Sequence, residues 1–261
     1  MIDTAGRQRL ADVLASAERD RVPVDPLTAG CPELDIVDAY EIQLLNIQRR
    51  VAQGSVVRGH KVGLSARAMQ QMMGVDEPDY GHLLDDMFVF EGEHVDTGTL
   101  CQPRVEVEVA FVLGARLPAP GCTVADVLAA TAFVAPAIEI IDSRIRDWKI
   151  SLTDTVADNA SSARVVLGGS RTSVDRVDLR TIGAVLRRNA EIVETGAAGA
   201  VLGNPATAVA WLANKVHDFG VTLDAGHVVM PGSCTRAVDV APGDVVRADF
   251  DSLGHVMVAF S

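Results

Sequence analysis

From Val56 to the C-terminus, the sequence alternates short, Val-rich segments with turns that are rich in Gly, Pro and Asp. Such segments are typical of β-strands joined by short turns. Nine segments fit this pattern: Val56–Leu64, Met87–Phe90, Val105–Leu113, Ala132–Ile141, Ala163–Leu167, His227–Met230, Ala237–Val240, Val245–Phe250 and His255–Phe260. Helical patterns are fewer and do not alternate regularly with the strands. The sequence therefore predicts an α+β fold with a curled, mixed sheet rather than a doubly wound sheet.

Helical periodicity dominates the residues before Val56. Ala5–Asp20 carries one apolar stripe, and Asp35 caps a second helix whose apolar residues recur at spacings of three and four up to Val51. Further helices are predicted at Ala66–Met73, at Val124–Ala130, and at Ala206–Phe219 after an Asn204 cap and Pro205 at the first helical position. We expect a helical N-terminal region, residues 1–55, packed on a β-rich catalytic core, residues 56–261, within one integrated domain.

Composition excludes several classes of partner. The chain of 261 residues has a formal net charge of -12, which argues against binding to nucleic acid or to an anionic membrane. Its longest apolar run, Ala130–Ile141, contains Pro136 and Glu139 and is too short to span a bilayer. The start of the sequence lacks a signal-peptide pattern, and the four cysteines form no C-x-x-C pair, so we expect a cytoplasmic protein with free thiols.

Motifs for dinucleotide, P-loop, serine-hydrolase and H-E-x-x-H zinc sites are absent, so no nucleotide cofactor is predicted.

Three carboxylates are placed where a metal ion could join them. Strict alternation around Glu106 and Glu108 puts both side chains on one face of a strand and the intervening valines on the other. This segment also fits a half-exposed strand with its charges in solvent. Glu139 lies inside an apolar strand, where a carboxylate must be paired or coordinated, although a buried salt bridge to an arginine would also satisfy it. If the two strands are neighbours, the three carboxylates need a cation, and oxygen-only ligands favour Mg²⁺ or Mn²⁺ over zinc.

Other polar segments leave two interpretations open. Lys61, one of only three lysines, lies between glycines on a predicted strand, where a ligand can approach the backbone closely. Asp76–His82 is predicted to be a Pro- and Gly-rich turn, and Asp154–Ser162 is rich in small polar side chains. Both segments fit solvated loops as well as the lining of a ligand pocket.

Taken together, six segments resemble one family. They are Gly59–Ser65, Pro78–Gly81, Pro103–Glu108, Ile138–Asp142, Asp158–Ser162, and Asn204–Pro205 with Trp211–Asn214. In this order they resemble the 2-keto-4-pentenoate (2-hydroxypenta-2,4-dienoate) hydratases, which are grouped with the 4-oxalocrotonate decarboxylases in the fumarylacetoacetate hydrolase superfamily. The resemblance extends from about Ile36 to the C-terminus and implies a curled, mixed β-sheet core with a helical N-terminal part.

The resemblance also implies roles for individual residues. Glu106, Glu108 and Glu139 would be the ligands of a single Mg²⁺ or Mn²⁺ ion. These three carboxylates, the glutamate trio, are the same ones that the strand pattern suggests as metal ligands. Lys61, Asp79 and Ser161 match positions for substrate binding and proton transfer in similar hydratases. Ser162 is adjacent, and the sequence does not settle which hydroxyl faces the substrate. Asp79 favours a hydratase, because the decarboxylases tend to have an apolar residue at that position.

Three functional hypotheses follow. The main hypothesis is a metal-dependent hydro-lyase that adds water to a 2-hydroxy-2,4-dienoate and yields a 4-hydroxy-2-oxoalkanoate, in the meta-cleavage degradation of aromatic or steroid rings. The alternatives are decarboxylation of a 4-oxalocrotonate-type 2-oxo acid, and a non-catalytic subunit that stabilises a partner enzyme. We expect a homo-oligomer, with possible association with a downstream aldolase or a related decarboxylase. The length of the substrate tail stays open.

Overall fold

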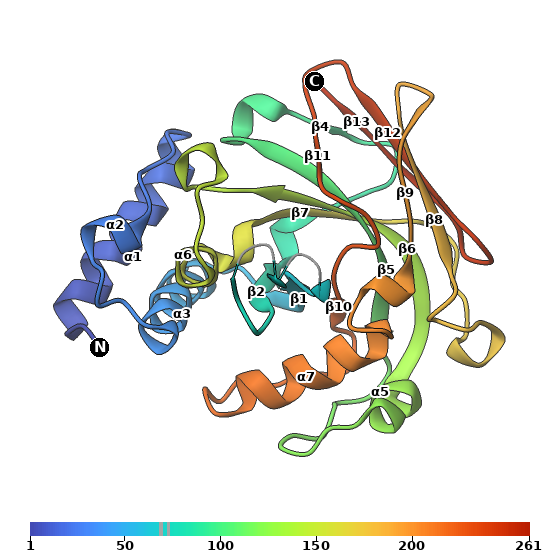
Figure 1. Cartoon of the computed structure of the whole chain (residues 1–261), viewed down its shortest axis with the longest axis horizontal. Helices are drawn as coiled ribbons and strands as arrows, with labels where there is room; N and C mark the ends of the chain where they lie inside the picture. The colour runs from blue at the N-terminus through green and yellow to red at the C-terminus, as the bar shows by residue number, and fades with distance from the viewer. Residues whose placement is uncertain (68–69, 72–73) are drawn as a thin grey trace.

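The computed structural model describes residues 1–67, 70–71 and 74–261 (Figure 1). The helix that we predict at Ala66–Met73 includes residues outside these ranges, so that prediction lies outside the described residues. The described part combines helices with two β-sheets, as the α+β prediction requires.

A mixed, curled sheet of eight strands forms the centre of the molecule (Figure 1). Its spatial order is β2 (Asp79–Leu84), β1 (Val57–Gly63), β10 (Val228–Met230), β5 (Pro103–Leu113), β6 (Thr131–Asp142), β7 (Ser162–Leu167) and β3 (Phe88–Val89), and β11 (Val238–Asp239) also pairs with β5. The β1–β10 and β3–β7 pairs are parallel, and the other pairs are antiparallel. The predicted curled, mixed sheet is therefore confirmed.

A second sheet of five strands packs against the first. Its order is β4 (His94–Val95), β13 (Gly254–Phe260), β12 (Val245–Phe250), β8 (Gly183–Arg188) and β9 (Glu191–Ala197). Strands β12 and β13 contact β6, and apolar residues of both sheets belong to one buried cluster, among them Val246, Val256 and Ile138. All nine predicted strands are present with small shifts of their ends. The sequence analysis missed β2, β4, β8 and β9; β9 is largely solvent-exposed and therefore has no strict apolar alternation.

The helices lie in two groups (Figure 1). One group is α1 (Thr4–Asp20), α2 (Leu27–Gly30), α3 (Ile36–Ala52) and α6 (Leu152–Ala157), and the other is α5 (Val124–Ala130) with α7 (Pro205–His217). The predicted caps are confirmed, because the side chains of Asp35 and Asn204 accept hydrogen bonds from backbone amides in the first turns of α3 and α7. Helix α7 ends two residues before the predicted end, and α2 and α6 are not predicted.

One buried side chain joins the N-terminal helices to the central sheet. Gln43 of α3 donates to the carbonyl oxygens of Tyr80 in β2, at 2.9 Å, and Val156 in α6, at 2.7 Å. Its Oε1 lies 2.8 Å from Nδ1 of His82. Helix α3 therefore fixes the elements that stand behind the polar site described below. The division of the chain into a helical N-terminal region, residues 1–55, and a β-rich core, residues 56–261, stays a proposal.

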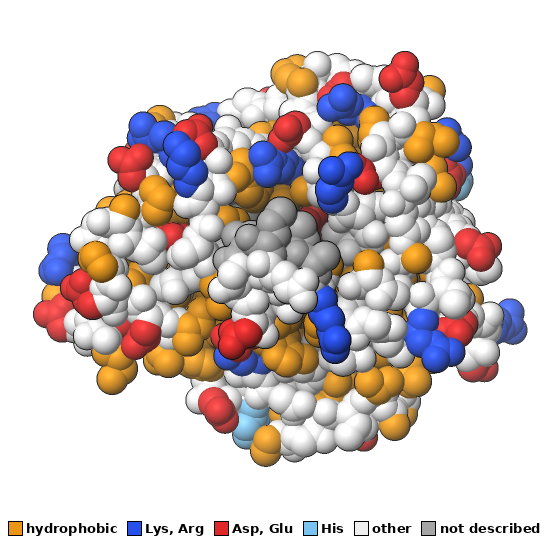
Figure 2. Space-filling model, viewed as in Figure 1, with side chains coloured by type: hydrophobic (Ala, Val, Ile, Leu, Met, Phe, Trp, Pro, Cys, Tyr) orange, Lys and Arg blue, Asp and Glu red, His pale blue; other side chains and the backbone are white. Residues whose placement is uncertain are grey.

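Three further observations concern the surface, the cysteines and the helices. On the face shown in Figure 2, acidic and basic side chains are interspersed among the described residues. All four cysteines are free, as expected. Within residues 1–67, 70–71 and 74–261, no helix is long and apolar enough to cross a membrane.

Candidate metal centre and active site

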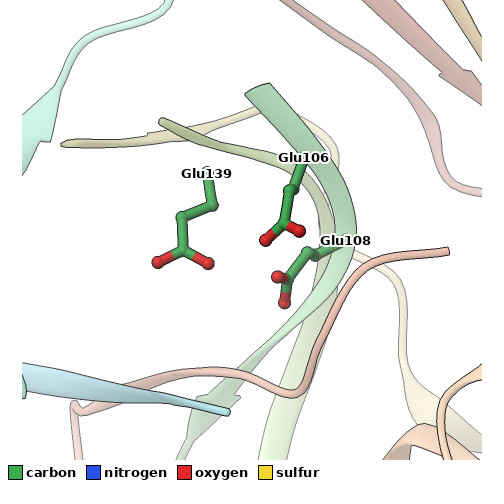
Figure 3. Close-up of side chains that lie close together, drawn as sticks. All are labelled: Glu106, Glu108 and Glu139. Carbon is green, nitrogen blue, oxygen red and sulfur yellow. The ribbon is translucent and has the colours of Figure 1, made fainter. Parts of the chain in front are cut away.

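Three glutamates from two neighbouring strands point into one space (Figure 3). Glu106 and Glu108 alternate with buried valines on β5, and the antiparallel register places Glu106 directly opposite Glu139 of β6. Side chains opposite each other in such a pair share a face and lie close together. One carboxylate oxygen from each glutamate lies within 4.8 Å of the others. The expected convergence of the three carboxylates is therefore present in the fold.

The donor set fits a hard divalent cation. Glu108 and Glu139 are fully buried and Glu106 is partly buried, so the alternative interpretation of a half-exposed strand with its charges in solvent is wrong. Gly232 N donates to Oε2 of Glu108 at 2.8 Å, but Oε1 of Glu108 and both carboxylate oxygens of Glu139 have no hydrogen-bond partner within the described residues. Buried carboxylate oxygens without donors are costly unless a cation coordinates them. Oxygen ligands of this kind suit Mg²⁺ or Mn²⁺.

The pKa values of Glu139 and Glu108 are raised, which reflects the same free-energy cost of burying carboxylates. Burial raises the pKa of Glu139 to about 7, although the ammonium of Lys61 opposes this shift. Burial, followed by repulsion from Glu139 and Glu106, raises the pKa of Glu108 well above its usual value. A bound cation would favour the deprotonated form of these carboxylates and would therefore oppose the rise in their pKa values.

Lys61 and Asp79 stand beside the trio. Lys61 lies on β1 with its Nζ 3.6 Å from Oε2 of Glu139 and 4.0 Å from Oδ1 of Asp79, and it donates to the carbonyl oxygen of Ala160 at 2.9 Å. Burial disfavours the charged amine, but attraction to Glu139 and Asp79 outweighs it, so the pKa of Lys61 is raised. Lys61 is therefore an ammonium that can hold an anionic group. Burial also raises the pKa of Asp79 against the opposing effect of Lys61.

Two neighbouring residues set the position of Asp79. The hydroxyl of Thr155, on α6, donates to Oδ2 of Asp79 at 2.9 Å, which leaves Oδ1 without a hydrogen-bond partner among the described residues. Gly63 lies opposite Asp79 in the β1–β2 pair. A Cβ atom at Gly63 would lie 2.2 Å from Oδ1 of Asp79 and 2.9 Å from Nζ of Lys61, so only glycine leaves room for this pair.

The two serines have different neighbours. The Ser161 hydroxyl lies 3.4 Å from Oδ2 of Asp158. The Ser162 hydroxyl donates to the carbonyl oxygen of Asn159 at 2.8 Å, and Ser162 borders a cavity of about 40 Å³ that is also lined by Asn46 of α3. Both serines are buried, and Ser161 directly follows Ala160, whose carbonyl Lys61 contacts.

Two sequence expectations need correction. We expect Asp76–His82 to be a turn, but its second half, from Asp79, belongs to the fully buried strand β2 (Asp79–Leu84), whose backbone pairs along β1. Asp154–Ser162 does not form a solvated loop, since it includes the end of α6 and a buried turn against β2. In both cases polar side chains obscured the burial, which comes from packing between distant segments.

The sequence analysis also missed residues that support the site. Thr155, Gly232 and Gln43 each bond to a residue of the site or to a strand that carries one. Gln43 is a polar residue on the apolar stripe of α3, and this was the one local signal in the sequence. The partners of Thr155 and Gly232 lie far away in the sequence, and no local pattern could reveal them.

Comparison with known proteins assigns the chain to a family. The pattern described as Fumarylacetoacetate (FAA) hydrolase C-terminal matches residues 56–260. The chain belongs to this family. It is 43% identical to the 2-keto-4-pentenoate hydratase of Paraburkholderia xenovorans, over 97% of this chain and 94% of that protein. It is also 43% identical to the 4-oxalocrotonate decarboxylase of Pseudomonas sp. strain CF600, over 96% of this chain and 95% of that protein.

Among solved structures, the 4-oxalocrotonate decarboxylase of Pseudomonas putida G7, complexed with magnesium and adipate, has a TM-score of 0.96. That structure is 40% identical and covers 100% of this chain and 99% of its own. The resemblance expected from the six segments is therefore confirmed for both the family and the fold. Overall identity does not separate a hydratase from a decarboxylase, so the site must carry that distinction.

Proposed function

We propose that this member of the fumarylacetoacetate hydrolase family is a metal-dependent hydro-lyase. Its substrate would be a 2-hydroxy-2,4-dienoate and its product a 4-hydroxy-2-oxoalkanoate, as in the meta-cleavage degradation of aromatic rings. The observation that carries the proposal is the position of Asp79, a buried carboxylate beside the trio with one oxygen that has no hydrogen-bond partner among the described residues. The hydratase relatives at similar identity support the same reaction class.

We propose Glu106, Glu108 and Glu139 as the ligands of Mg²⁺ or Mn²⁺. The unpaired oxygens of the trio support this assignment, and a related structure contains magnesium. The bound ion would supply Lewis acidity toward the substrate carboxylate and 2-oxygen and would neutralise the charge of the trio. Three protein ligands leave coordination positions for a substrate.

Lys61 and Asp79 would handle the protons. Addition of water to the dienoate requires ketonisation, in which the 2-hydroxyl loses a proton and C5 gains one. Water then attacks C4, the attacking water loses a proton, and C3 gains one. Asp79 would orient the water through Oδ1, since Thr155 occupies its other oxygen. The Lys61 ammonium would hold the anionic end of the substrate and share in the proton transfer. Ser161 would hold a substrate oxygen.

Decarboxylation of a 4-oxalocrotonate-type 2-oxo acid is the second candidate, because decarboxylase relatives are equally similar. A buried carboxylate at position 79 weighs against it, since loss of CO₂ benefits from a site without a group that holds water. The test is to supply purified protein with 2-hydroxypenta-2,4-dienoate and with 4-oxalocrotonate, with EDTA and then with added Mg²⁺ or Mn²⁺. Metal-dependent consumption of the dienoate supports the hydratase, and CO₂ release from 4-oxalocrotonate supports the decarboxylase.

A non-catalytic partner subunit is the third hypothesis. The intact trio speaks against it, and metal-dependent turnover by the purified chain alone would reject it. Three finer properties belong to the same proposal: a cytoplasmic homo-oligomer, a role in the breakdown of aromatic or steroid rings, and association with a downstream aldolase or a related decarboxylase.

A further inference from the structure

A strained turn lies directly after α6. Asn159, Ala160 and Ser161 have φ angles of 53°, 49° and 56°, in the left-handed region that residues other than glycine seldom adopt. Three such residues in succession persist only where the surroundings over-determine the backbone. The turn must therefore be held by its neighbours.

Strand β2 holds one side of the turn. The Asn159 side chain accepts a hydrogen bond from the backbone nitrogen of His82 at 2.7 Å and donates to the His82 carbonyl oxygen at 3.0 Å. Gly81 allows this close approach, because a Cβ atom there would lie 2.5 Å from the carbonyl oxygen of Asn159. The side chain of Asn159 thus extends the hydrogen bonding of β2 to the turn.

A buried ion pair holds both ends of the turn. The guanidinium of Arg144, which is 5% exposed, donates from Nε to Oδ1 of Asp158 at 2.5 Å and from Nη1 to the carbonyl oxygen of Ser162 at 3.1 Å. It also donates to the backbone carbonyls of Asp142 and Asp158. The Arg144 backbone nitrogen bonds to the other carboxylate oxygen of Asp158 at 3.0 Å. One side chain therefore connects the residue before the turn, the residue after it and the end of β6.

The turn ends at the site. Its central carbonyl, that of Ala160, accepts the hydrogen bond from Nζ of Lys61 at 2.9 Å, which is the shortest polar contact of that ammonium within the described residues. Ser161 follows, with its hydroxyl toward Asp158. A shift of the turn would move the acceptor that places Lys61 between Glu139 and Asp79.

We propose that Arg144 and Asp158 are positioning residues for catalysis, which hold the strained turn so that the Ala160 carbonyl and Ser161 stay fixed against Lys61. This inference rests on the proposed function and adds two residues that do not contact the reacting atoms. The guanidinium is required because its planar fork donates in several fixed directions, which the ammonium of lysine does not reproduce.

The test compares two Arg→Lys variants. Arg144→Lys should lower kcat by about 10- to 100-fold, the cost of a small misplacement of a catalytic group, while Mg²⁺ affinity stays at the wild-type value. Arg7→Lys is the matched control, since Arg7 pairs with the buried Asp38 at 2.7 Å in the N-terminal helices and does not contact the site. It should leave kcat unchanged. Asp158→Asn, which keeps the side-chain shape, replaces Arg144→Lys if the latter does not fold.

A double-mutant cycle separates positioning from general stability. If Arg144 acts through Lys61, Arg144→Lys should cost little further activity in a Lys61→Ala background. Amide hydrogen exchange of residues 158–162 should become faster in Arg144→Lys, relative to β12 peptides, but not in Arg7→Lys. Wild-type kcat with unchanged exchange, or fully additive losses with Lys61→Ala, would overturn the inference.

Failure of the proposed function would look different. In that case the wild-type chain would consume neither 2-hydroxypenta-2,4-dienoate nor 4-oxalocrotonate with metal present. The exchange measurement alone would then decide whether Arg144 holds the turn. Unchanged exchange in both Arg144→Lys and Asp158→Asn would reject that role.

Discussion

The glutamate trio of the eight-stranded sheet and Asp249 of the five-stranded sheet lie in opposite environments. In the eight-stranded sheet, Glu108 and Glu139 are fully buried and carry carboxylate oxygens without donors among the described residues. In the five-stranded sheet, Asp249 of β12 lies near the surface and pairs with Arg187 and Arg247. Surface pairs of this kind add little to stability, whereas the burial of an excess of carboxylates opposes folding.

This difference indicates which sheet carries the function. Natural proteins tolerate locally unfavourable arrangements where activity requires them and avoid them elsewhere. Asp249 of the five-stranded sheet is paired within that sheet, and strands β12 and β13 pack against β6. The trio of the eight-stranded sheet places three carboxylates beside the ammonium of Lys61, an excess of negative charge that a bound cation would neutralise.

The largest expected effect is that of Glu139→Gln. This change removes a ligand charge and keeps the side-chain size, so Mg²⁺ affinity should fall by more than about 100-fold, because even changes outside the ligand shell cost 10- to 100-fold. Turnover should be lost with it. Isothermal titration with Mg²⁺ measures the effect, and Glu194→Gln in β9, where Glu194 pairs with Arg236 at 2.6 Å, is the matched control. Wild-type Mg²⁺ affinity in Glu139→Gln would remove Glu139 from the ligand set.

Asp79→Asn should have the next largest effect. An amide is a poor base for water, so kcat should fall by about 10² to 10⁴-fold, while KM and Mg²⁺ affinity change little because Asp79 lies outside the trio. Steady-state kinetics on 2-hydroxypenta-2,4-dienoate measures this split. A wild-type kcat would leave Asp79 without a catalytic role and would remove the main reason to prefer a hydratase.

The stability of the metal-free protein should depend on pH in a defined direction. The pKa of Glu139 rises from its usual 4.5 to about 7 on folding, so the native state binds this proton more tightly than the unfolded state. Stability from this group is therefore present at low pH and is lost as the pH rises through about 7. Mg²⁺ binds the deprotonated form, so its stabilising effect on Tm should grow between about pH 5 and pH 8. Thermal unfolding with EDTA or Mg²⁺ tests this, and a pH-independent Mg²⁺ effect would contradict it.

The smallest effect is expected from Asp249→Asn. Its arginine partners are partly exposed, so Tm should change by no more than about 2 °C, and kcat and Mg²⁺ affinity should stay at wild-type values. Differential scanning calorimetry and steady-state kinetics measure both. A large loss of activity would show that the five-stranded sheet has more than a structural role.

The sequence by itself determined nine of the strands, the helices α1, α3, α5 and α7, and the shared face of Glu106 and Glu108. Alternation along β5 depends only on the period of a strand, and the caps Asp35 and Asn204 depend only on local hydrogen bonding. The resemblance to a family then supplied the candidate roles of Lys61 and Asp79. Local physics predicts such features because they involve neighbours in the chain.

Only the tertiary structure decided how the elements meet. The register of β5 and β6 places Glu139 opposite Glu106, and the pairing of β1 with β2 turns an expected loop into a buried strand at Asp79. The contacts of Arg144 with the turn at 158–162 bridge separate segments in the same way. Pairing of this kind depends on the packing of the whole sheet, and a strand shifted by one residue would present its other face, so no local pattern determines it.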